Sequence, residues 1–448
     1  MSNSRQLHLN AFLRNVGQHE AAWRLPETRI ASVTDISHYQ NLAKIAERGK
    51  LDAIFFADHP VLKDRAQDRP WDSLDPFTLI AALSGVTKRI GLVATASTTY
   101  NDPYGLARRF ATLDHVSSGR AAWNAVTTAN AAAAANFSLG HHPDPDARYE
   151  RAAEFLDIVN RLWDSWDDDA IVGDKEGGTF VDPEGIHRLD HHGKHFDVAG
   201  PLEVPRSPQG RPVVFQAGSS EPGKDLAARY AEAIFTAQPV LDEAQAFYSD
   251  VKARVRAYGR DPDKVHILPG LSTFIGGTEE EAKKLQETFE NLTLPTYGLA
   301  QLQRVTGIDY SSHGLDDVVR VPSRSEVASD MRSRHDLVHH LTSTETITLR
   351  QLLRRLSAGR GHRIATGTPE QIADTIVQWF ENGAADGFNL IPPALPTSLE
   401  AFVDTVVPIL QKRGVFRKDY EGTTLRDHLG LDRPDVTRAT RAYVAAAE

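Results

Sequence analysis

Short apolar segments alternate with longer stretches of helical periodicity along most of this chain. Eight of the apolar segments are predicted as strands: residues 7–13, 51–58, 89–97, 121–127, 212–218, 233–238, 265–275 and 386–391. Between them the apolar positions follow a helical repeat, as in 149–166, which is typical of an amphipathic helix. The repeated strand–helix pattern predicts an α/β protein built as a (β/α)₈ barrel, the TIM barrel. A doubly wound open sheet is the alternative, because the pattern alone does not show closure.

Two long stretches interrupt the repeat. Residues 167–211 are rich in Gly, Asp, His and Pro, and we expect a hairpin or a surface excursion there. Residues 291–362 are polar and separate strands seven and eight, where a long insertion commonly forms a lid or shapes the substrate site. The tail, from about residue 415 to residue 448, carries aromatic residues, and we expect it to pack on a neighbouring subunit. Because we find no internal repeat or low-complexity linker, we interpret 1–448 as a single domain.

Composition removes several classes of function. The 448 residues include no cysteine, which excludes disulfides, thiolate metal sites and thiol nucleophiles. The net charge of −10 argues against a general nucleic-acid binder, which needs a basic surface. No apolar run approaches the roughly 20 residues that span a bilayer, and no secretory signal is recognisable at the N-terminus. We therefore expect a cytoplasmic protein with neither nucleic-acid nor membrane partners.

Polar residues gather where the predicted strands end, which is where an α/β barrel carries its active site. Asp58 and His59 follow the second strand, and the third ends in a row of hydroxyls over 95–99. The fourth strand contains Asn124. The strand ends therefore predict the position of the site, although Asp58 could equally hold a ligand hydroxyl, pair with an arginine or act as a base.

The turn after the fifth strand has the most specific chemistry. Ser219 and Ser220 follow Gly218 and precede a predicted helix. Small residues let the backbone approach a ligand closely, and the free N–H groups at a helix start bind phosphate well. The alternative is an ordinary serine N-cap after a glycine turn. Both interpretations remain open on the residues alone.

The histidines do not predict a metal site. Adjacent histidines on a strand point to opposite faces, and none of the pairs has the spacing of two histidines and a carboxylate on one element. His19, at the exit of the first strand, and His59 are better placed, and we regard both as tentative catalytic residues. The adjacent pairs occur at 141–142, 191–192 and 339–340.

Taken together, several long segments resemble the nitrilotriacetate and dibenzothiophene-sulfone monooxygenases of the bacterial-luciferase-like superfamily. The resemblance implies a luciferase-like barrel and a two-component, FMNH₂-dependent monooxygenase that uses O₂ on a small organic substrate. It also implies a separate NAD(P)H-dependent flavin reductase as partner and a homodimer or homotetramer. The segments that carry it are LHLNAFLRNVGQHEAAWRLPE, LDAIFFAD, GLVATASTTYNDPYGLARRFATLDHVSSGRAAWNAVTT, RYERAAEFLDIVNRLWDSW and PVVFQAGSSEPGKDLAARYAEAIF.

The resemblance also implies the flavin contacts. Related sequences carry a histidine four residues before the tyrosine that matches Tyr149. This chain has Pro145 at that position, and proline cannot supply the hydrogen-bond donor or acceptor that an imidazole provides. His141 or His142 could replace it. The implied FMN-binding residues are Asp58, Thr95, Ser97, Asn124, Tyr149, Ser219 and Ser220.

Three other functions remain as alternatives. The same superfamily contains F₄₂₀-dependent oxidoreductases, which share the barrel but transfer hydride. A metal-dependent barrel hydrolase would be built on Asp58-His59 and the other histidine pairs. A non-catalytic flavin-binding protein would result if Pro145 disables the site. The substrate is not identified by the sequence, because the resemblance covers enzymes for chelators, sulfones, alkanes and heterocycles.

Overall fold

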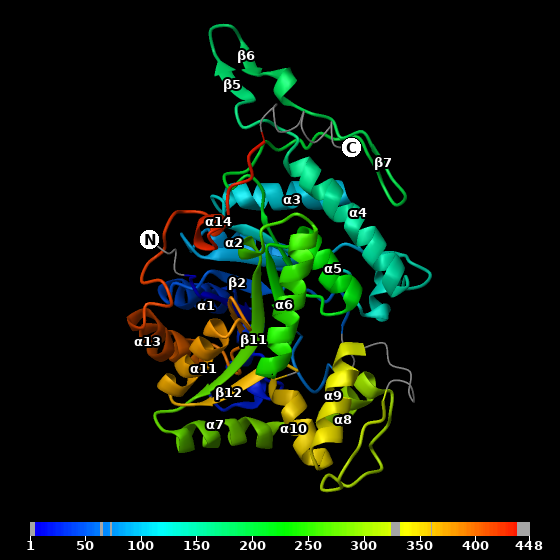
Figure 1. Cartoon of the computed structure of the whole chain (residues 1–448), viewed down its shortest axis with the longest axis vertical. Helices are drawn as coiled ribbons and strands as arrows, with labels where there is room; N and C mark the ends of the chain where they lie inside the picture. The colour runs from blue at the N-terminus through cyan, green and yellow to red at the C-terminus, as the bar shows by residue number, and fades with distance from the viewer. Residues whose placement is uncertain (1–4, 63–65, 72–73, 324–331, 360, 437–448) are drawn as a thin grey trace.

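Eight parallel strands form a closed barrel in the computed structural model, which describes residues 5–62, 66–71, 74–323, 332–359 and 361–436. Their order around the barrel is β1-β2-β3-β4-β9-β10-β11-β13, and the helices pack around them (Figure 1). The strands are β1 (His8–Leu13), β2 (Ala53–Phe56), β3 (Gly91–Ser97), β4 (Ala121–Val126), β9 (Val213–Gln216), β10 (Ala233–Thr236), β11 (His266–Ile275) and β13 (Gly387–Leu390).

Two pairings close the barrel. β13 pairs with β1, with His8 opposite Gly387, and β11 pairs with both β10 and β13. All eight predicted strands are therefore present and no barrel strand has a free edge. The prediction of a (β/α)₈ barrel is confirmed, and the open doubly wound sheet is excluded.

Side chains alternate between the barrel interior and the surrounding helices, as a period of two requires. On β4, Ala122 belongs to the interior apolar cluster, whereas Trp123 belongs to the outer one. The main surrounding helices are α1 (Ile36–Arg48), α2 (Pro76–Ser84), α3 (Pro103–Val116), α4 (Pro145–Trp163), α5 (Glu221–Tyr230), α6 (Leu241–Ala257), α11 (Pro369–Glu381), α12 (Thr397–Ala401) and α13 (Val407–Lys412).

A ninth strand, β12 (Arg363–Gly367), was not predicted from the sequence. It pairs with the second half of the long strand β11, from Leu271 opposite Arg363 to Ile275 opposite Gly367. The five residues RIATG lack the apolar run that marks a buried strand, because β12 lies beyond the closed barrel and is only partly covered.

The insertion between β11 and β13 folds into helices at the carboxyl ends of the strands. These helices lie at the lower end of the molecule in Figure 1 and have their own apolar core, which includes Leu302, Val305 and Leu352. Positions 324–331 and 360 of this insertion lie outside the described residues. The helices are α7 (Glu279–Leu292), α8 (Pro295–Thr306), α9 (Arg332–Thr344) and α10 (Leu349–Gly359).

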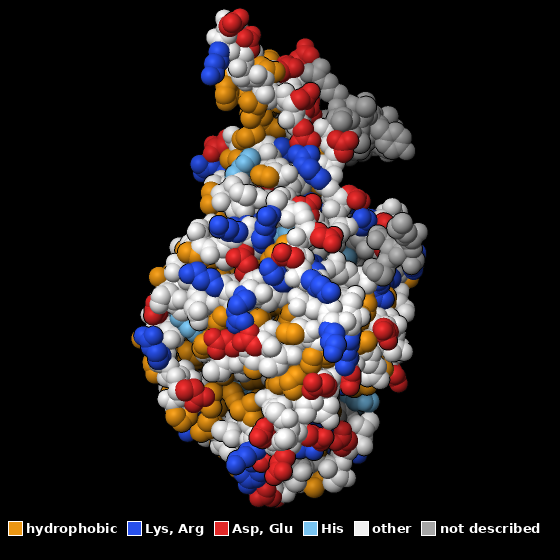
Figure 2. Space-filling view, turned by 90° about the vertical axis from the view of Figure 1, so that its left-hand side faces the viewer, with side chains coloured by type: hydrophobic (Ala, Val, Ile, Leu, Met, Phe, Trp, Pro, Cys, Tyr) orange, Lys and Arg blue, Asp and Glu red, His pale blue; other side chains and the backbone are white. Residues whose placement is uncertain are grey.

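The stretch 167–211 lies at the opposite end of the barrel and contains two small hairpins. β5 (Ile171–Asp174) pairs with β6 (Thr179–Val181), and β7 (His191–His192) pairs with β8 (Asp197–Val198). The first hairpin projects as an arm at the top of Figure 1, and apolar side chains lie on its surface in Figure 2. Phe180 on this arm is 71% exposed.

The described part of the tail packs against its own barrel. Leu425, on α14 (Leu425–His428), belongs to the interior apolar cluster together with Val93 and Val213. Its N–H donates to the Gly119 carbonyl just before β4, so the tail covers the amino-terminal ends of the strands. Up to residue 436 the tail thus packs on its own barrel, its contact with a neighbouring subunit stays a prediction, and 437–448 lie outside the described residues.

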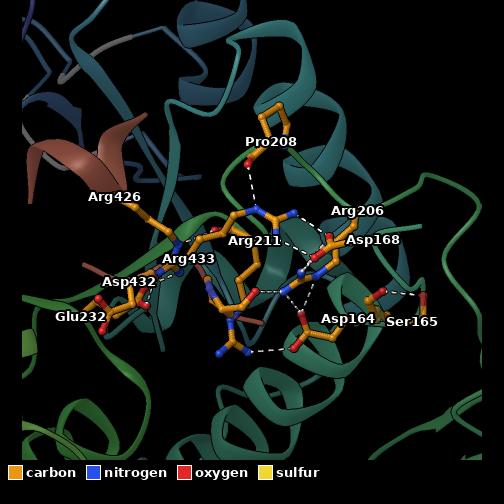
Figure 3. A network of polar contacts seen from close by, with 12 residues as sticks. Asp164, Ser165, Asp168, Arg206, Pro208, Arg211, Glu232, Arg426, Asp432 and Arg433 are labelled. Carbon is orange, nitrogen blue, oxygen red and sulfur yellow. Dashed lines mark hydrogen bonds and ion pairs between the residues drawn. The ribbon is translucent and has the colours of Figure 1, made fainter. Parts of the chain in front are cut away.

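A network of ion pairs fixes the tail to the rest of this face (Figure 3). Both guanidinium nitrogens of Arg426 bind the Glu232 carboxylate, at 2.7 and 3.1 Å. The Asp168 carboxylate accepts hydrogen bonds from Arg433 at 2.6 Å and from Arg206 at 2.9 Å, so the tail and the 167–211 stretch share one carboxylate.

Within the described ranges, no helix is both long and apolar enough to cross a membrane.

Candidate active site

The loops at the carboxyl ends of the strands bring most of the predicted site residues to one face, the barrel mouth. The loops after β1, β2, β3, β4, β9 and β10 all open on this face, because the strands are parallel. The inserted helices follow β11 on the same side (Figure 1). The mouth is therefore bordered by strand-exit loops on the barrel side and by the insertion.

The start of α5 forms a cradle for an anion. Ser220 is the N-cap of α5, and its Oγ accepts from the Gly223 N–H at 3.2 Å. Tyr149, from the first turn of α4, lies with its hydroxyl 3.3 Å from the same Oγ. Gly218 approaches Gly223 so closely that a Cβ on Gly218 would lie 2.9 Å from the Gly223 Cα. Pro222 has no N–H, and the N–H groups of Gly223 and Lys224 donate to Ser220, so the Glu221 N–H, two hydroxyls and a surface without side chains remain to contact a phosphate.

A second row of hydroxyls adjoins this cradle. Ser219 lies with its Oγ 3.2 Å from the Thr236 Oγ1 at the end of β10, and the Gln238 amide donates to the same Thr236 oxygen at 3.2 Å. The exits of β9 and β10 thus form one polar strip beside the phosphate-sized cradle.

Thr95 and Asn124 lie side by side in the barrel interior. They are register partners on β3 and β4, and the Asn124 Nδ2 donates to the Thr95 Oγ1 at 2.9 Å. The Asn124 Oδ1 is buried and has no hydrogen-bond partner. A buried acceptor without a partner is costly, so this oxygen fits the N–H edge of a bound ring.

Ser97 forms hydrogen bonds with residues of the loops at the exits of β3 and β4. Its Oγ accepts from the Thr128 hydroxyl at 2.7 Å and from the backbone N–H groups of Thr99 and Tyr100, at 3.1 and 3.3 Å. These contacts hold the exits of β3 and β4 together. They favour an arrangement in which the hydroxyls at this exit satisfy their own backbone over one in which Ser97 contacts a flavin.

Asp58 and His59 follow β2 at the mouth. Burial raises the pKa of Asp58 to about 6, the charge of Asp75 adds to the rise, and the His59 N–H opposes it by donating to the carboxylate. The His59 side chain is exposed. Asp58 therefore changes charge close to neutral pH, as residues of functional sites often do.

His19 is enclosed at the exit of β1. Its ring packs edge-to-face on Phe289, with centroids 5.0 Å apart, and burial lowers its pKa to about 3. The Nδ1 accepts from the Ala21 N–H at 3.2 Å, so in the neutral ring Nε2 carries the proton. This Nε2 is buried and has no hydrogen-bond partner. At neutral pH His19 is a neutral hydrogen-bond donor.

Pro145 has a structural role at the start of α4. It is the first residue of the helix, a position that tolerates proline because its N–H would have no intrahelical partner. Three residues earlier, the His142 Nδ1 lies 2.8 Å from the Tyr100 hydroxyl. The His142 Nε2 is buried without a partner. Of the two histidines considered as replacements, His142 is thus held against the β3 exit.

A charged cluster between the barrel and the insertion was missed by the sequence analysis. Glu20, after β1, is hydrogen bonded to Tyr297 on α8, and the charges of Arg14 and Arg69 act on it. The Arg69 Nη1 donates to the Tyr297 hydroxyl at 3.3 Å. Arg14 and Glu20 stand at a strand exit, which was a usable signal. No sequence signal marked Tyr297, because its position depends on how the insertion packs on the barrel.

The histidine pairs do not assemble a metal site. Among the residues that the structure describes, no group of three or more histidine or carboxylate side chains is arranged to hold a metal ion. His192 forms an exposed pair with Asp197 at 2.8 Å, and His191 pairs with Glu154 at 3.0 Å at the far end of the barrel from the mouth.

Comparison with known proteins gives a consistent result. The family model described as luciferase-like monooxygenase matches residues 16–386. The chain is 48% identical to nitrilotriacetate monooxygenase component A of Aminobacter aminovorans, with 97% of this chain and 98% of the relative covered. It is 47% identical to N-acetyl-S-(2-succino)cysteine monooxygenase of Bacillus subtilis (strain 168), with the same coverage.

A solved structure shares the whole architecture. The crystal structure of a riboflavin lyase with modified FMN and riboflavin superimposes with a TM-score of 0.85 at 32% identity, covering 96% of this chain and 97% of the other. The resemblance stated from the sequence segments is thereby confirmed, and so is the luciferase-like type of the barrel.

Proposed function

The chain belongs to the luciferase-like monooxygenase family, and from this premise we propose that it is an oxygenase component whose reduced FMN is supplied by a separate NAD(P)H-dependent flavin reductase. The enzyme is an FMNH₂-dependent monooxygenase, and O₂ is its co-substrate. The observation that carries the proposal at the site is the cradle at the start of α5, where Ser220 and Tyr149 meet.

The described residues at the mouth fit FMN. Ser219, Ser220 and the Glu221 N–H would hold the phosphate, with Tyr149 beside it. Asn124 would present its unpartnered oxygen, with Thr95 beside it, to the polar edge of the ring. Reduced FMN supplies the electrons that activate O₂.

The protein's own contribution is orientation and protection from water. The inserted helices follow β11 on the side of the mouth, and we infer that they exclude water from it. His19 would donate a hydrogen bond from Nε2, since its burial keeps the ring neutral. His59, exposed at the rim, is better placed to exchange protons with solvent.

The substrate is proposed to be a small organic molecule that contains nitrogen or sulfur. Relatives at 47–48% identity are named for nitrilotriacetate and for N-acetyl-S-(2-succino)cysteine. These names support a small polar compound for this chain more than a long alkane.

The test is reconstitution. Purified protein, FMN, a flavin reductase, NADH and O₂ are combined with candidate substrates, and oxygenated product is measured by mass spectrometry with ¹⁸O₂. We expect one ¹⁸O atom in the product. Reduced F₄₂₀ in place of FMNH₂ should support no turnover. Hydride transfer from F₄₂₀ would support the F₄₂₀-dependent oxidoreductase instead, and tight FMN binding with no turnover on any candidate would support the non-catalytic flavin-binding protein.

A pH dependence follows from Asp58. If the ionised carboxylate accepts a hydrogen bond from the flavin, riboflavin affinity should rise as the pH increases through about 6, because the pKa of Asp58 lies there. Riboflavin avoids the titration of the FMN phosphate itself. The inflection, measured by fluorescence quenching, should vanish in Asp58→Asn. It should move to lower pH in Asp75→Asn, which removes the charge that helps to raise this pKa. An unchanged inflection in Asp58→Asn would exclude this contact.

A further inference from the structure

An imidazole from the end of the insertion reaches into the barrel mouth. His362 stands between α10 and β12, and β12 begins opposite Leu271 of β11. The His362 ring lies nearly parallel to the ring of Phe235, the third residue of β10, with centroids 5.1 Å apart and an interplanar angle of 15°. A polar ring is thus held against an apolar residue of the barrel interior.

Gly270 provides the space for this ring. A Cβ on Gly270 would lie 2.3 Å from the Nδ1 of His362 and 2.6 Å from the Cδ1 of Ile391, far closer than non-bonded atoms approach each other. Gly270 is two residues after Leu268, which belongs to the interior apolar cluster, so both positions face the barrel interior. Any side chain at Gly270 would therefore displace the imidazole or the Ile391 side chain.

The imidazole covers part of an apolar layer. We define the apolar floor as Phe12, Phe55, Phe215, Phe235 and Ile391, which belong to one interior cluster and are each at most 8% exposed. The Phe235 ring packs edge-to-face on Phe12 and on Phe55, with centroids 5.3 and 5.7 Å apart. The four phenylalanines lie in the second half of their strands and Ile391 directly follows β13, so the floor is at the mouth end of the interior. Apolar surface of this kind attracts apolar groups from water wherever it is accessible.

His362 lies on the side of the mouth that the flavin leaves open. The proposed flavin contacts are the cradle after β9 and, on β3 and β4, Thr95 and Asn124. Phe235 and Gly270 belong to β10 and β11, and β11 is separated from β4 by two strands in one direction and by four in the other. A flavin held by the cradle and by Asn124 leaves the exits of β11, β13 and β1 for a substrate, and the imidazole borders that space.

We propose that His362 is a specificity-determining residue, whose ring closes the apolar floor beneath the substrate and thereby excludes long apolar chains. Without the ring, a space of imidazole size would open between Phe235, Ile391 and the backbone of Gly270. Apolar cavities of this kind remain dry and take up hydrocarbons. With the ring in place this space is filled, and the mouth accepts small compounds. This inference rests on the proposed monooxygenase function and names the residue that limits its substrate class.

The test measures the binding of two sulfides that differ only in chain length. Dimethyl sulfide is the short probe and methyl n-hexyl sulfide the long one, and Kd is measured by calorimetry on the full-length protein, with and without FMN. Each buried CH₂ group lowers Kd about fourfold, and an imidazole-sized space takes about two of them. We therefore expect His362→Ala to bind the long sulfide at least about tenfold more tightly than the wild type does, while the Kd of dimethyl sulfide changes less than about threefold.

Further measurements assign this gain to the ring. His362→Phe keeps a ring on Phe235 without the nitrogen atoms, so it should bind the long sulfide as weakly as the wild type does. Free imidazole added to His362→Ala should refill the space and weaken binding of the long sulfide toward the wild-type value. His340→Ala is the matched control, because His340 is an exposed histidine of the same insertion. If the alanine variant fails to fold, His362→Val, which leaves part of the space empty, decides the test with an expected gain of about threefold or more.

The outcomes separate this inference from the proposed function. An alanine variant that binds the long sulfide no more tightly than the wild type overturns the role of His362. A gain that free imidazole does not reverse, or that His362→Phe shares in full, also overturns it, because the chain would then bind elsewhere. Failure of the wild type to bind FMN contradicts the proposed function instead, whereas the titrations without FMN still decide whether the ring covers the floor.

Discussion

Ser220→Asp is expected to weaken FMN binding by about 100-fold or more while riboflavin binding changes little. Aspartate is as good an N-cap as serine, so α5 should still begin at Glu221. Its carboxylate, however, would stand where the flavin phosphate is proposed to lie, and like charges in contact cost several kcal/mol. Fluorescence titration of both flavins against wild type and variant measures the effect.

The control for this prediction is Ser220→Asn, which keeps a capping side chain of the same size without the charge. We expect it to lose less than about tenfold in FMN affinity. If the aspartate variant loses FMN and riboflavin affinity equally, or if the asparagine variant is equally impaired, the phosphate does not lie at the start of α5.

Arg417→Met is expected to destabilise the fold by about 3–5 kcal/mol, because it removes the arginine partner of a buried carboxylate, whose other basic neighbour, His8, lies 3.1 Å away. The Arg417 Nη2 lies 2.5 Å from the Oδ1 of Asp52, which is fully buried and also accepts from the Leu9 N–H at 2.6 Å. Urea unfolding monitored by tryptophan fluorescence gives the difference in free energy.

The pH dependence of this difference provides a second readout. Burial alone would raise the pKa of Asp52, but the charges of Arg417 and His8 lower it from 3.8 to about 2. A lowered pKa means that the ion pair stabilises the fold above pH 3.8 and that this stabilisation is lost as the pH falls through about 2. The difference in free energy of unfolding between wild type and Arg417→Met should therefore become smaller as the pH falls from 3.8 to about 2.

Arg433→Met is the matched control on the same tail. Its ion pair with Asp168 at 2.6 Å is partly exposed, 43% for the arginine side chain, so we expect a loss below about 1 kcal/mol. If both variants are equally destabilised, the tail acts through its packing and not through the buried charge of Asp52.

One face of the barrel contributes mainly to stability, and the opposite face carries the residues proposed for chemistry. The tail closes the amino-terminal face through Leu425 and the ion pairs drawn in Figure 3. The opposite face keeps its polar strand exits for cofactor and substrate, as in other barrels. Substitutions on the tail should therefore affect stability more than kinetics. Substitutions at the strand exits should affect kinetics more than stability.

Local sequence patterns were enough to predict the barrel and to place the proposed flavin contacts at the strand exits. Eight apolar runs predicted the eight barrel strands, because a strand buried on both faces must be apolar along its length. Strand exits such as Ser219–Ser220 were recognisable because glycine and serine before a helix are a local signal. The segments that resemble known monooxygenases then indicated FMN and O₂, which the family model and relatives confirm.

Only the tertiary structure decided the contacts between distant segments. Arg417 meets Asp52 across 365 positions, Tyr100 meets His142 across 42, and Tyr297 reaches Glu20 from an insertion without strand periodicity. Such contacts cannot be recognised from the local spacing of residues in the sequence, because each partner residue is compatible with many environments until the barrel closes. The cofactor followed from the segments that resemble known monooxygenases, whereas the contacts of Tyr297 depend on how the insertion packs on the barrel.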